Sequence, residues 1–425
     1  MRLDRRGFLQ MGAGASLGAL VCPRPAGAAG FSVGVGRSPN GYVAARRAIE
    51  ASGEWPPVSL AGRTVVVKPN LVVALPASSG ATTDPAVVRA VVDLALAGGS
   101  AEVLIVETSA SGALFGPCGY GFFESYDPLG RVRLADLRDF PVVAAPVPAA
   151  LAYPSIDVPD LVLRSEVVFV SVGKLKVHME TYATLSTKNL FGLPVLDRYP
   201  AFPPNGRFAM HDRGVSQTIV DLSRLRPVHF AVIDGVFGME GAGPLLGTPV
   251  RTDTVVAGRN SVAVDRVGLV AMGLEQWPAR HLAYAARFGL GPADLEGITV
   301  RGDPLAPRPF ALSALAPVLE YPRVVPGSFN PGSGQRTSAL VWYAERCVRA
   351  LDVLRLHDDR PDADLVRALV SYDYREPGWE VVGWDGRDAD GALAPPGRYA
   401  VHVRAFSTRS QVRHADAVGW VTVGA

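Results

Sequence analysis

Lysine is nearly absent from this 425-residue chain. Of its 42 lysines and arginines only four are lysines, and three of these fall within VGKLKVHMETYATLSTKNLFG, residues 172–192. Lysine offers a compact ammonium whose pKa its surroundings can change, whereas arginine is planar and always charged. We therefore interpret the lysines as positions where arginine cannot serve. They are Lys68, Lys174, Lys176 and Lys188.

Cysteine is also scarce, with three residues and no CxxC pair. This pattern argues against an iron–sulfur cluster or a cysteine-ligated zinc site. Cys22 falls in a leader segment described below, and a Cys118–Cys347 disulfide remains open. The formal net charge is only +2, which does not suggest nucleic acid as a partner.

No apolar run is long enough to span a membrane. The N-terminus instead combines the paired arginines of DRRGFLQ, residues 4–10, a short apolar stretch, and AGA at 26–28. This combination predicts a twin-arginine signal peptide over residues 1–29. We expect the chain to engage the twin-arginine translocation machinery and to be exported, to the periplasm or outside the cell.

Between residues 30 and 325 the pattern predicts an α/β domain. Continuous apolar runs indicate strands buried on both faces, as in a parallel sheet. These runs are 64–70, 102–109, 166–174 and 229–235. Helical periodicity with capping residues separates them, at 84–98, 215–225 and 261–273. We therefore predict a mainly parallel β-sheet core with flanking helices.

A segment rich in Gly, Pro and Ser at 325–335 predicts a domain boundary. Beyond it, short strand-like runs are divided by turn residues, which favours a small all-β sandwich over residues 326–425. Trp384 and Tyr399 are its expected buried anchors. We place no catalysis in this part of the chain.

Each of the four buried strands is predicted to end in a charged residue. In parallel sheets, ligand sites lie outside the carboxyl ends of the strands. We therefore expect these side chains to share one charged hollow. They are Lys68, Glu107, Lys174 and Asp234.

The predicted chemistry follows from these residue types. Lysines can hold a phosphate or carboxylate, or act as bases and nucleophiles once desolvated, and carboxylates with a histidine can bind a divalent metal or carry protons. The candidate catalytic residues are Lys174, Lys176, His178, Lys188 and Asp234. The candidate substrate-binding residues are Lys68, Asn70, Glu107 and Asn189. The candidate metal ligands are Asp234, Glu240 and Asp265, the last in the first turn of a helix.

The sequence is compatible with several hypotheses about this site. The first is an enzyme acting on a small anionic substrate, with or without a divalent metal. The second is a non-catalytic ligand-binding or cell-envelope scaffold protein. A redox protein with an outside cofactor is a third, against which the cysteine count argues. The glycines of DGVFGMEGAGPLLG, residues 234–247, suggest a loop that approaches a ligand closely or simply a flexible turn.

Several blocks resemble the bacterial and archaeal family called domain of unknown function 362. They are VVVKPNLV, ATTDPAVVRAVVDLALAGG, VGKLKVHMETYATLSTKNLFG, VIDGVFGMEGAGPLLG and NSVAVDRVGLVAMG, within residues 31–305. Some family members are associated with four-iron ferredoxin domains, for which this chain lacks the cysteines. Asp84 stands where the family commonly has His. The layout is also distantly similar to the nickel-pincer lactate racemase family.

The C-terminal part is similar to the Ig-like repeat of flagellar hook-capping proteins. The resemblance rests on FNPGS at 329–333 and on WDGRDADGALAPPGRYAVHVRAF at 384–406. It implies an accessory module that docks on a partner in the cell envelope.

Overall fold

The computed structural model describes most of the chain after the predicted leader. The described residues are 30–108, 114–178, 180–195, 198–199, 210, 215–245, 247–274, 276, 279–312, 319–343, 346–357, 363–408 and 414–424. The predicted signal peptide, residues 1–29, lies outside them. No helix within these ranges is long and apolar enough to cross a membrane.

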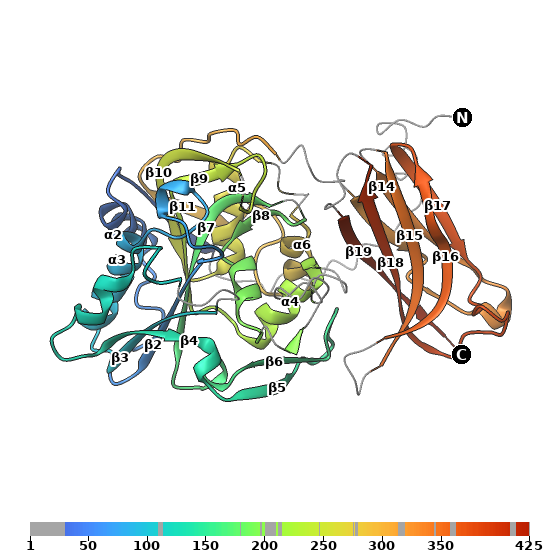
Figure 1. The fold of residues 1–425 in the computed structure, drawn as a ribbon, viewed down its shortest axis with the longest axis horizontal. Coiled ribbons are helices and arrows are strands. Elements are labelled where there is room, and N and C mark those ends of the chain that lie inside the picture. Colours follow the sequence, from blue (N-terminus) through green and yellow to red (C-terminus); the bar gives the residue numbers. More distant parts are fainter. Residues whose placement is uncertain are drawn as a thin grey trace. The chain divides into compact units, whose positions relative to one another are not determined.

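A nine-stranded, mainly parallel sheet forms the centre of the α/β part (Figure 1). Its order is β11-β1-β10-β9-β7-β2-β3-β4, with β8 paired to β7. The run from β9 to β4 is parallel, and β10 is antiparallel to both of its neighbours. The strands are β1 (Phe31–Arg37), β2 (Thr64–Pro69), β3 (Glu102–Glu107), β4 (Val132–Asp136), β7 (Val168–His178), β8 (Tyr182–Leu185), β9 (Phe230–Glu240), β10 (Thr248–Gly258) and β11 (Ile298–Gly302).

Helices cover both faces of this sheet. On one face lie α2 (Gly41–Ser52) and α3 (Pro85–Ala97), and on the other lie α4 (Val215–Leu225), α5 (Ser261–Ala271) and α6 (Arg280–Arg287). Short 3₁₀ turns and a two-stranded ribbon complete this part. They are η1 (Ala77–Ser79), η2 (Gly121–Ser125), η3 (Leu137–Asp139), η4 (Asp160–Leu163), η5 (Lys188–Gly192), β5 (Val142–Pro146) and β6 (Ser155–Pro159).

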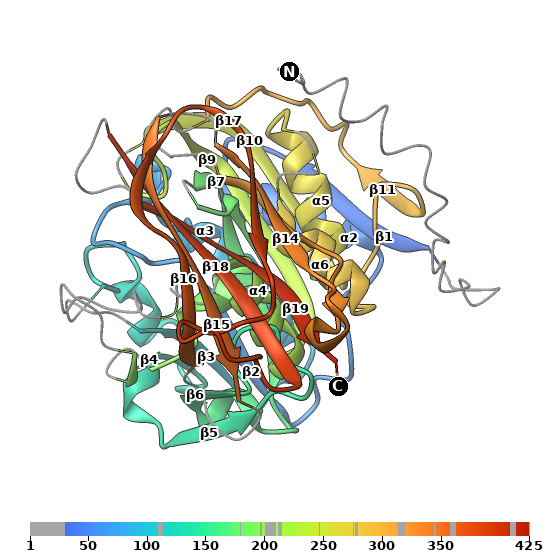
Figure 2. The same cartoon turned by 90° about the vertical axis from the view of Figure 1, so that its right-hand side faces the viewer.

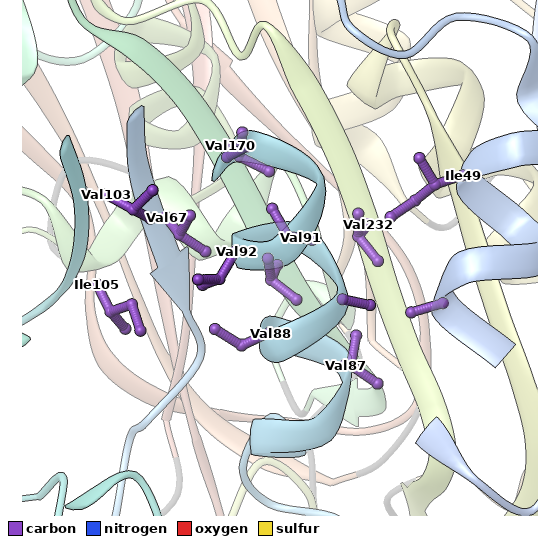
Figure 3. Close-up of a cluster of buried hydrophobic side chains, with 14 of the residues drawn as sticks. Ile49, Val67, Val87, Val88, Val91, Val92, Val103, Ile105, Val170 and Val232 are labelled. Carbon is purple, nitrogen blue, oxygen red and sulfur yellow. The ribbon is translucent and has the colours of Figure 1, made fainter. Parts of the chain in front are cut away.

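Helix α3 shows why the sequence folds this way. Asp84 caps the helix by accepting a hydrogen bond from the amide of Ala86, Pro85 occupies the first turn, and Gly98 follows the last residue. The valines of α3 then pack on valines and isoleucines from β2, β3, β7 and β9 (Figure 3). Fully burying each such side chain stabilises the fold by roughly 1.5–3 kcal/mol.

The structure confirms the predicted mainly parallel core and also corrects one prediction. The glycine-rich segment expected to be a loop continues β9 through Glu240, paired with β10. A Cβ at Gly238 would lie 2.7 Å from the backbone oxygen of Leu175 and 2.7 Å from the ring of Phe310. Close packing of neighbouring strands, rather than approach to a ligand, accounts for that glycine.

The C-terminal part contains two sheets. One has the order β12-β14-β17, the other β13-β19-β18-β15-β16 (Figure 2). All pairs are antiparallel except β13 with β19. The elements are β12 (Leu319–Val325), β13 (Ser328–Phe329), η8 (Pro331–Ser333), β14 (Thr337–Tyr343), β15 (Cys347–Leu356), β16 (Ala363–Arg375), β17 (Gly378–Trp384), β18 (Gly397–Ser407) and β19 (His414–Val423).

Both of these sheets contribute to one hydrophobic cluster. Trp384 and Tyr399 are buried there with ring centroids 5.3 Å apart, as anchors were expected to be. Strand β12 pairs with β14 although it precedes residue 326. The C-terminal sheets therefore begin earlier along the chain than the predicted boundary.

Candidate functional site

The carboxyl ends of the central strands bring the predicted charged residues to one edge of the sheet. Lys68 on β2 lies opposite Ser171 on β7, and Lys174 on β7 lies opposite Asp234 on β9. Glu107 ends β3, the strand beside β2. Because these strands are parallel, their last residues meet at the same edge, as the sequence predicted.

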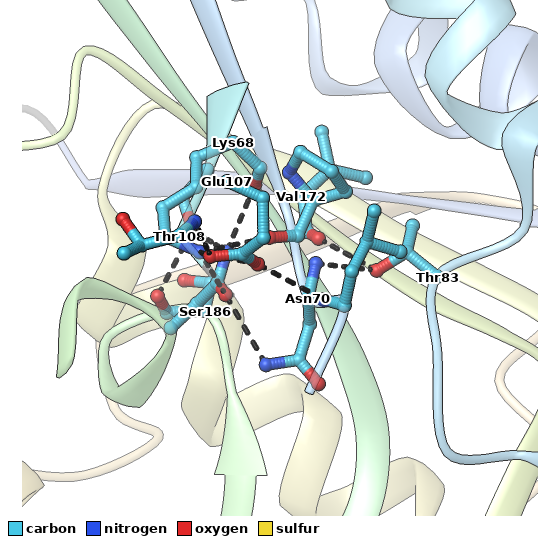
Figure 4. Close-up of polar contacts among 11 residues, drawn as sticks. Lys68, Asn70, Thr83, Glu107, Thr108, Val172 and Ser186 are labelled. Atoms are coloured by element: carbon cyan, nitrogen blue, oxygen red, sulfur yellow. Dashed lines mark hydrogen bonds and ion pairs between the residues drawn. The ribbon is translucent and has the colours of Figure 1, made fainter. Parts of the chain in front are cut away.

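Lys68 and Glu107 form a buried ion pair (Figure 4). The Lys68 ammonium lies 2.9 Å from each carboxylate oxygen of Glu107. The same carboxylate accepts hydrogen bonds from the amides of Leu71 and Thr108. A Cβ at Gly192 would lie 2.7 Å from the Lys68 ammonium, so a side chain there would require the ammonium to move. The charge of Lys68 is thus balanced within the protein.

Two asparagines complete this cluster. The buried Asn189 amide donates to the backbone oxygen of Lys68 at 2.9 Å and to the hydroxyl of Ser171 at 3.1 Å. Its own oxygen accepts from the side-chain amide of Asn70 at 3.3 Å. Asn189 therefore ties η5 to β2 and β7, and it orients Asn70 at the edge of the sheet.

Lys174 and Asp234 form a second ion pair, with 2.6 Å between ammonium and carboxylate and no exposure of either side chain. Asp234 also accepts hydrogen bonds from the amides of Asp84 and Val236. Burial raises the pKa of Asp84, and the negative charge of Asp234 raises it further. Asp84, which the sequence suggested only as a helix cap, therefore also belongs to the site.

Lys176 differs from these two lysines. Its side chain is 1% exposed, and its one hydrogen bond among the described residues goes to the backbone oxygen of Ala81, at 2.6 Å. Burial holds the pKa of Lys176 well below its ordinary value of 10.5. The charges of Lys188 and Lys174 lower this pKa further, whereas Glu107 raises it. Burial and the two neighbouring cations thus both disfavour the charged form of Lys176.

The lysines divide between the two faces of the sheet. Side chains two residues apart on a strand lie on the same face of the sheet. Lys68 therefore shares the face of Val66, which packs on the α4 side. Lys174 shares the face of Val172, which packs on the α3 side. Thr83 joins the two sides at the edge, because its hydroxyl accepts from the amide of Asn70 and donates to the oxygen of Val172. The single hollow that the sequence suggested is thus two clusters that meet at the sheet edge.

Lys188 and His178 lie close to this edge. Lys188 is partly buried, with its ammonium 5.2 Å from the ring centre of Phe191. His178 ends β7, and its Nδ1 accepts from the amides of Glu180 and Thr181. Accepting at Nδ1 assigns the ring proton to Nε2, which is the neutral tautomer.

Asp265 has a positioning role. It is the fifth residue of α5, beyond the first turn in which the sequence analysis placed it. Its carboxylate accepts from the amide of Ser186 at 2.8 Å, from the amide of Thr187 at 2.9 Å and from the Thr187 hydroxyl. Burial raises the pKa of Asp265 to about 6. These bonds hold the segment that leads into η5 and carries Lys188 and Asn189.

The structure does not bring the predicted metal ligands together. Asp234 pairs with Lys174, Asp265 holds Ser186 and Thr187, and Glu240 accepts from the amide of Ala311 at 2.9 Å. Within the described ranges, no group of three or more His, Cys, Asp or Glu side chains is placed to hold a metal ion. The three carboxylates were grouped from strand and helix ends, and they serve three separate structural contacts.

Three buried polar atoms at the edge have no hydrogen-bond partner in the described part of the chain. They are the side-chain oxygens of Asn70, Thr108 and Ser186. Buried polar atoms are normally satisfied, so these three are candidate contacts for a ligand. Of the three, only Asn70 could be singled out from the sequence, because it lies beside Lys68. Cys118 and Cys347, the two cysteines in the described residues, are buried and are not joined by a disulfide.

Fold and site together define an α/β protein with a buried lysine–carboxylate site at the carboxyl edge of a mainly parallel sheet. Residues 65–270 match the family model described as Domain of unknown function (DUF362). This range contains every candidate residue from Lys68 to Asp265, and it supports the resemblance seen in the sequence blocks. The predicted leader and the C-terminal sheets lie outside it. No curated protein matches the chain.

Two solved structures show weak likeness. The alkylpurine DNA glycosylase AlkC of Pseudomonas fluorescens, bound to DNA with an abasic-site analogue, is 15% identical with a TM-score of 0.17, over 25% of this chain and 30% of that one. The β-glucosidase EmGH1 of Erythrobacter marinus is 14% identical with a TM-score of 0.16, over 88% and 48%. This chain thus spans less than half of either protein, and neither likeness supports an argument about fold or function.

Proposed function

We propose that this chain is an exported enzyme that acts on a small anionic substrate, bearing a phosphate or carboxylate, at the carboxyl edge of its sheet. Lys176 supplies the reactive amine. Lys188 supplies positive charge near that amine, and His178 carries protons at the edge. The observation that carries this proposal is that Lys176 is buried and forms no ion pair with a carboxylate among the described residues, its printed contact being the oxygen of Ala81.

The physical argument is the cost of a buried charge. An ammonium has three N–H groups, and the described residues offer Lys176 one acceptor, the oxygen of Ala81. A charged Lys176 would leave donors unsatisfied in a dry environment. Lys68 and Lys174, in contrast, have carboxylate partners. A neutral lysine is costly to keep for structure alone but useful as a base or nucleophile, so it points to chemistry.

Lys68, Lys174, Glu107 and Asp234 then frame the site rather than bind substrate directly. Their charges cancel in pairs, and their hydrogen bonds fix the ends of three strands. The unpartnered oxygens of Asn70, Thr108 and Ser186 offer contacts to a ligand. This division of roles narrows the candidate reactive groups to Lys176, Lys188 and His178.

The alternative is a non-catalytic protein that captures an anion. The nearly complete burial of Lys68, Lys174 and Lys176, all at 1% exposure or less, favours it, because turnover needs access to the reactive atoms. On this alternative the ligand binds through Lys188 at the edge, and no bond is made or broken.

The scarcity of lysine allows a direct test. Protein labelled with ¹³C at lysine Cε gives four signals, which single Lys→Arg variants assign. We expect the Lys176 signal to be that of a neutral amine at neutral pH, and added phosphate or acetate to shift the Lys188 and Lys176 signals. Lys68 and Lys174 act as internal controls, since their ion pairs keep them charged. A protonated Lys176 at neutral pH contradicts the proposal.

A turnover assay distinguishes the enzyme hypothesis from the hypothesis of a non-catalytic binding protein. A panel of small phosphate esters and carboxylic acids is incubated in deuterated water with the wild-type protein or with Lys176→Met. An enzyme that uses Lys176 gives deuterium exchange or a new product only with the wild type. Binding of the same ligands without any chemical change in either sample favours the alternative.

We further propose that residues 1–29 direct export through the twin-arginine pathway and that the C-terminal sheets form an Ig-like module that docks on an envelope partner. The paired Arg5 and Arg6 and the two sheets around one core support these roles. Replacing both arginines by lysine keeps the charge but removes the twin-arginine pair. We expect export to stop, and continued export would refute the signal.

A further inference from the structure

Lys176 is placed as a nucleophile rather than only as a base. Its Nζ donates one hydrogen to the Ala81 oxygen, 2.6 Å away, and this leaves the lone pair of a neutral amine unused by any described residue. The carboxylates of Glu107 and Asp234 are already paired with other lysines. Lys176 itself forms no ion pair among the described residues, and its printed contact is the neutral oxygen of Ala81.

The surroundings also favour the neutral state throughout a reaction. The nearby charges of Lys174 and Lys188 both oppose protonation of Lys176. Desolvation together with a neighbouring cation is a general way to activate a lysine toward carbonyl carbon. Attack on phosphorus or saturated carbon needs an activated leaving group, whereas a carbonyl adds a neutral amine reversibly without one. A carbonyl compound is therefore the substrate class that Lys176 can engage with no further reactant.

We propose that Lys176 forms an imine with an oxo acid, a small carboxylic acid that also bears an aldehyde or ketone. This inference rests on the proposed function and narrows it to one substrate class. The acid group suits the positive charge that Lys188 adds at the edge. The unpartnered hydroxyls of Thr108 and Ser186 can donate hydrogen bonds to the carboxylate, and the unpartnered amide oxygen of Asn70 can accept one from the hydroxyl of the first adduct.

The step is balanced without any further reactant. The lone pair of Nζ forms a bond to the carbonyl carbon, and one amine hydrogen passes to the carbonyl oxygen. The second amine hydrogen leaves with that oxygen as water, and a C=N bond remains. No group is oxidised or reduced, and water reverses the step. The imine then withdraws electrons from the adjacent carbon, which makes its bonds easier to break.

Reductive trapping tests the inference. The full chain is incubated with pyruvate and sodium borohydride, and the product is examined by intact mass and peptide mapping. We expect one reduced adduct, on Lys176. Acetone, which has the carbonyl without the acid, is expected to give less adduct. Lys68 and Lys174 are expected to stay unmodified, because their amines are held as buried ammonium ions.

Variants make the test specific. Lys176→Met and Lys176→Arg should both lose the adduct while their circular dichroism stays that of the wild type. If one of them fails to fold, the map of the wild-type adduct still decides the site. An adduct on Lys188 or on the N-terminal amine alone, or none with pyruvate or glyoxylate, overturns the inference.

The same samples distinguish this inference from the proposed function. The ¹³C signal of Lys176 reports its protonation, and its response to pyruvate reports binding. If Lys176 is neutral and its signal responds to pyruvate but borohydride traps no adduct, the imine proposal is refuted and the proposed function is not. A Lys176 that is protonated at neutral pH removes both.

Discussion

At the scale of single residues, two neighbouring lysines on β7 differ in whether a carboxylate balances them. Lys174 neutralises the fully buried Asp234, whereas Lys176 neutralises nothing among the described residues. Removing one partner of a buried ion pair leaves an uncompensated charge, but removing a neutral amine does not. The two positions therefore predict different costs for the same substitution.

We expect Lys174→Met to lower the free energy of unfolding by about 3–5 kcal/mol, because it strands the charge of Asp234. Lys176→Met should cost no more than about 1–3 kcal/mol, the penalty for leaving the Ala81 oxygen without a donor. Urea unfolding of the two variants measures the difference. Equal losses would mean that Lys176 is also a structural ion, and the reactive amine would have to be sought elsewhere.

The lowered pKa of Lys176 predicts a pH dependence of stability. The folded chain holds this amine neutral, whereas the unfolded chain protonates it below its ordinary pKa of 10.5. The unfolded state therefore binds one more proton between the two pKa values, and stability falls as the pH drops below 10.5. The stability of the wild type relative to Lys176→Met should thus decrease as the pH is lowered from about 10 through the alkaline range. A constant difference in thermal midpoint across that range would contradict the lowered pKa.

How far the sequence predicts the site can be judged from these residues. The scarcity of lysine singled out Lys68, Lys174 and Lys176, and strand ends placed them at one edge. The pairing could not be predicted, because it depends on which face of the sheet each side chain takes. Asp84 was missed because its capping role explained it fully. Asp265 was grouped with the metal ligands because the sequence cannot distinguish a carboxylate that accepts amide hydrogen bonds from one that binds a metal.

At the scale of elements, the segment that leads from β8 into η5 depends on α5. Asp265 accepts the amides of Ser186 and Thr187 across this contact. Asp221 on α4 does the same for Leu151, Ala152 and Tyr153, and burial raises its pKa to about 6 as well. The two carboxylates have similar roles in different places. Asp265 holds a segment beside the lysines, and Asp221 holds a different loop, so Asp221 can serve as a control.

Asp265→Asn should destabilise the protein by about 1–3 kcal/mol, because an amide oxygen cannot replace both carboxylate oxygens as acceptor. It should also speed hydrogen exchange at the amides of Ser186 and Thr187 and shift the ¹³C signal of Lys188. Asp221→Asn should cost a similar amount and leave that signal in place. If both variants moved the Lys188 signal alike, the effect would be general loosening rather than positioning by Asp265.

The positions of strands were predictable from the sequence where burial on both faces determines the residue types. Runs of Val and Ile located β2, β3, β7 and β9 because both faces of these strands are buried. The ends of β7 and β9 were underestimated, since charged residues and glycines interrupt the apolar runs there. Strand β16 has a weak apolar pattern for a related reason, because many of its side chains are exposed.

At the scale of the whole molecule, the chain builds its hydrophobic clusters separately in the α/β part and in the C-terminal sheets. The cluster around Trp384 contains no residue before Phe329 among its buried members. The predicted boundary near residue 325 lies close to the start of this cluster, and β12 begins slightly earlier, at Leu319. Separate cores predict separate responses to a core substitution.

Trp384→Ala tests that independence. The indole packs on Tyr399 and Phe329, and its ring nitrogen donates to the oxygen of Arg387. Truncating a buried Trp costs about 3–5 kcal/mol, so calorimetry should show one unfolding transition at a lower temperature and the other unchanged. The ¹³C signals of Lys68, Lys174 and Lys176 should stay at their wild-type positions, because the sheet edge that holds them shares no core residue with Trp384. A shift of those signals would mean that the C-terminal sheets shape the lysine site, and the accessory role would then have to be replaced by a direct one.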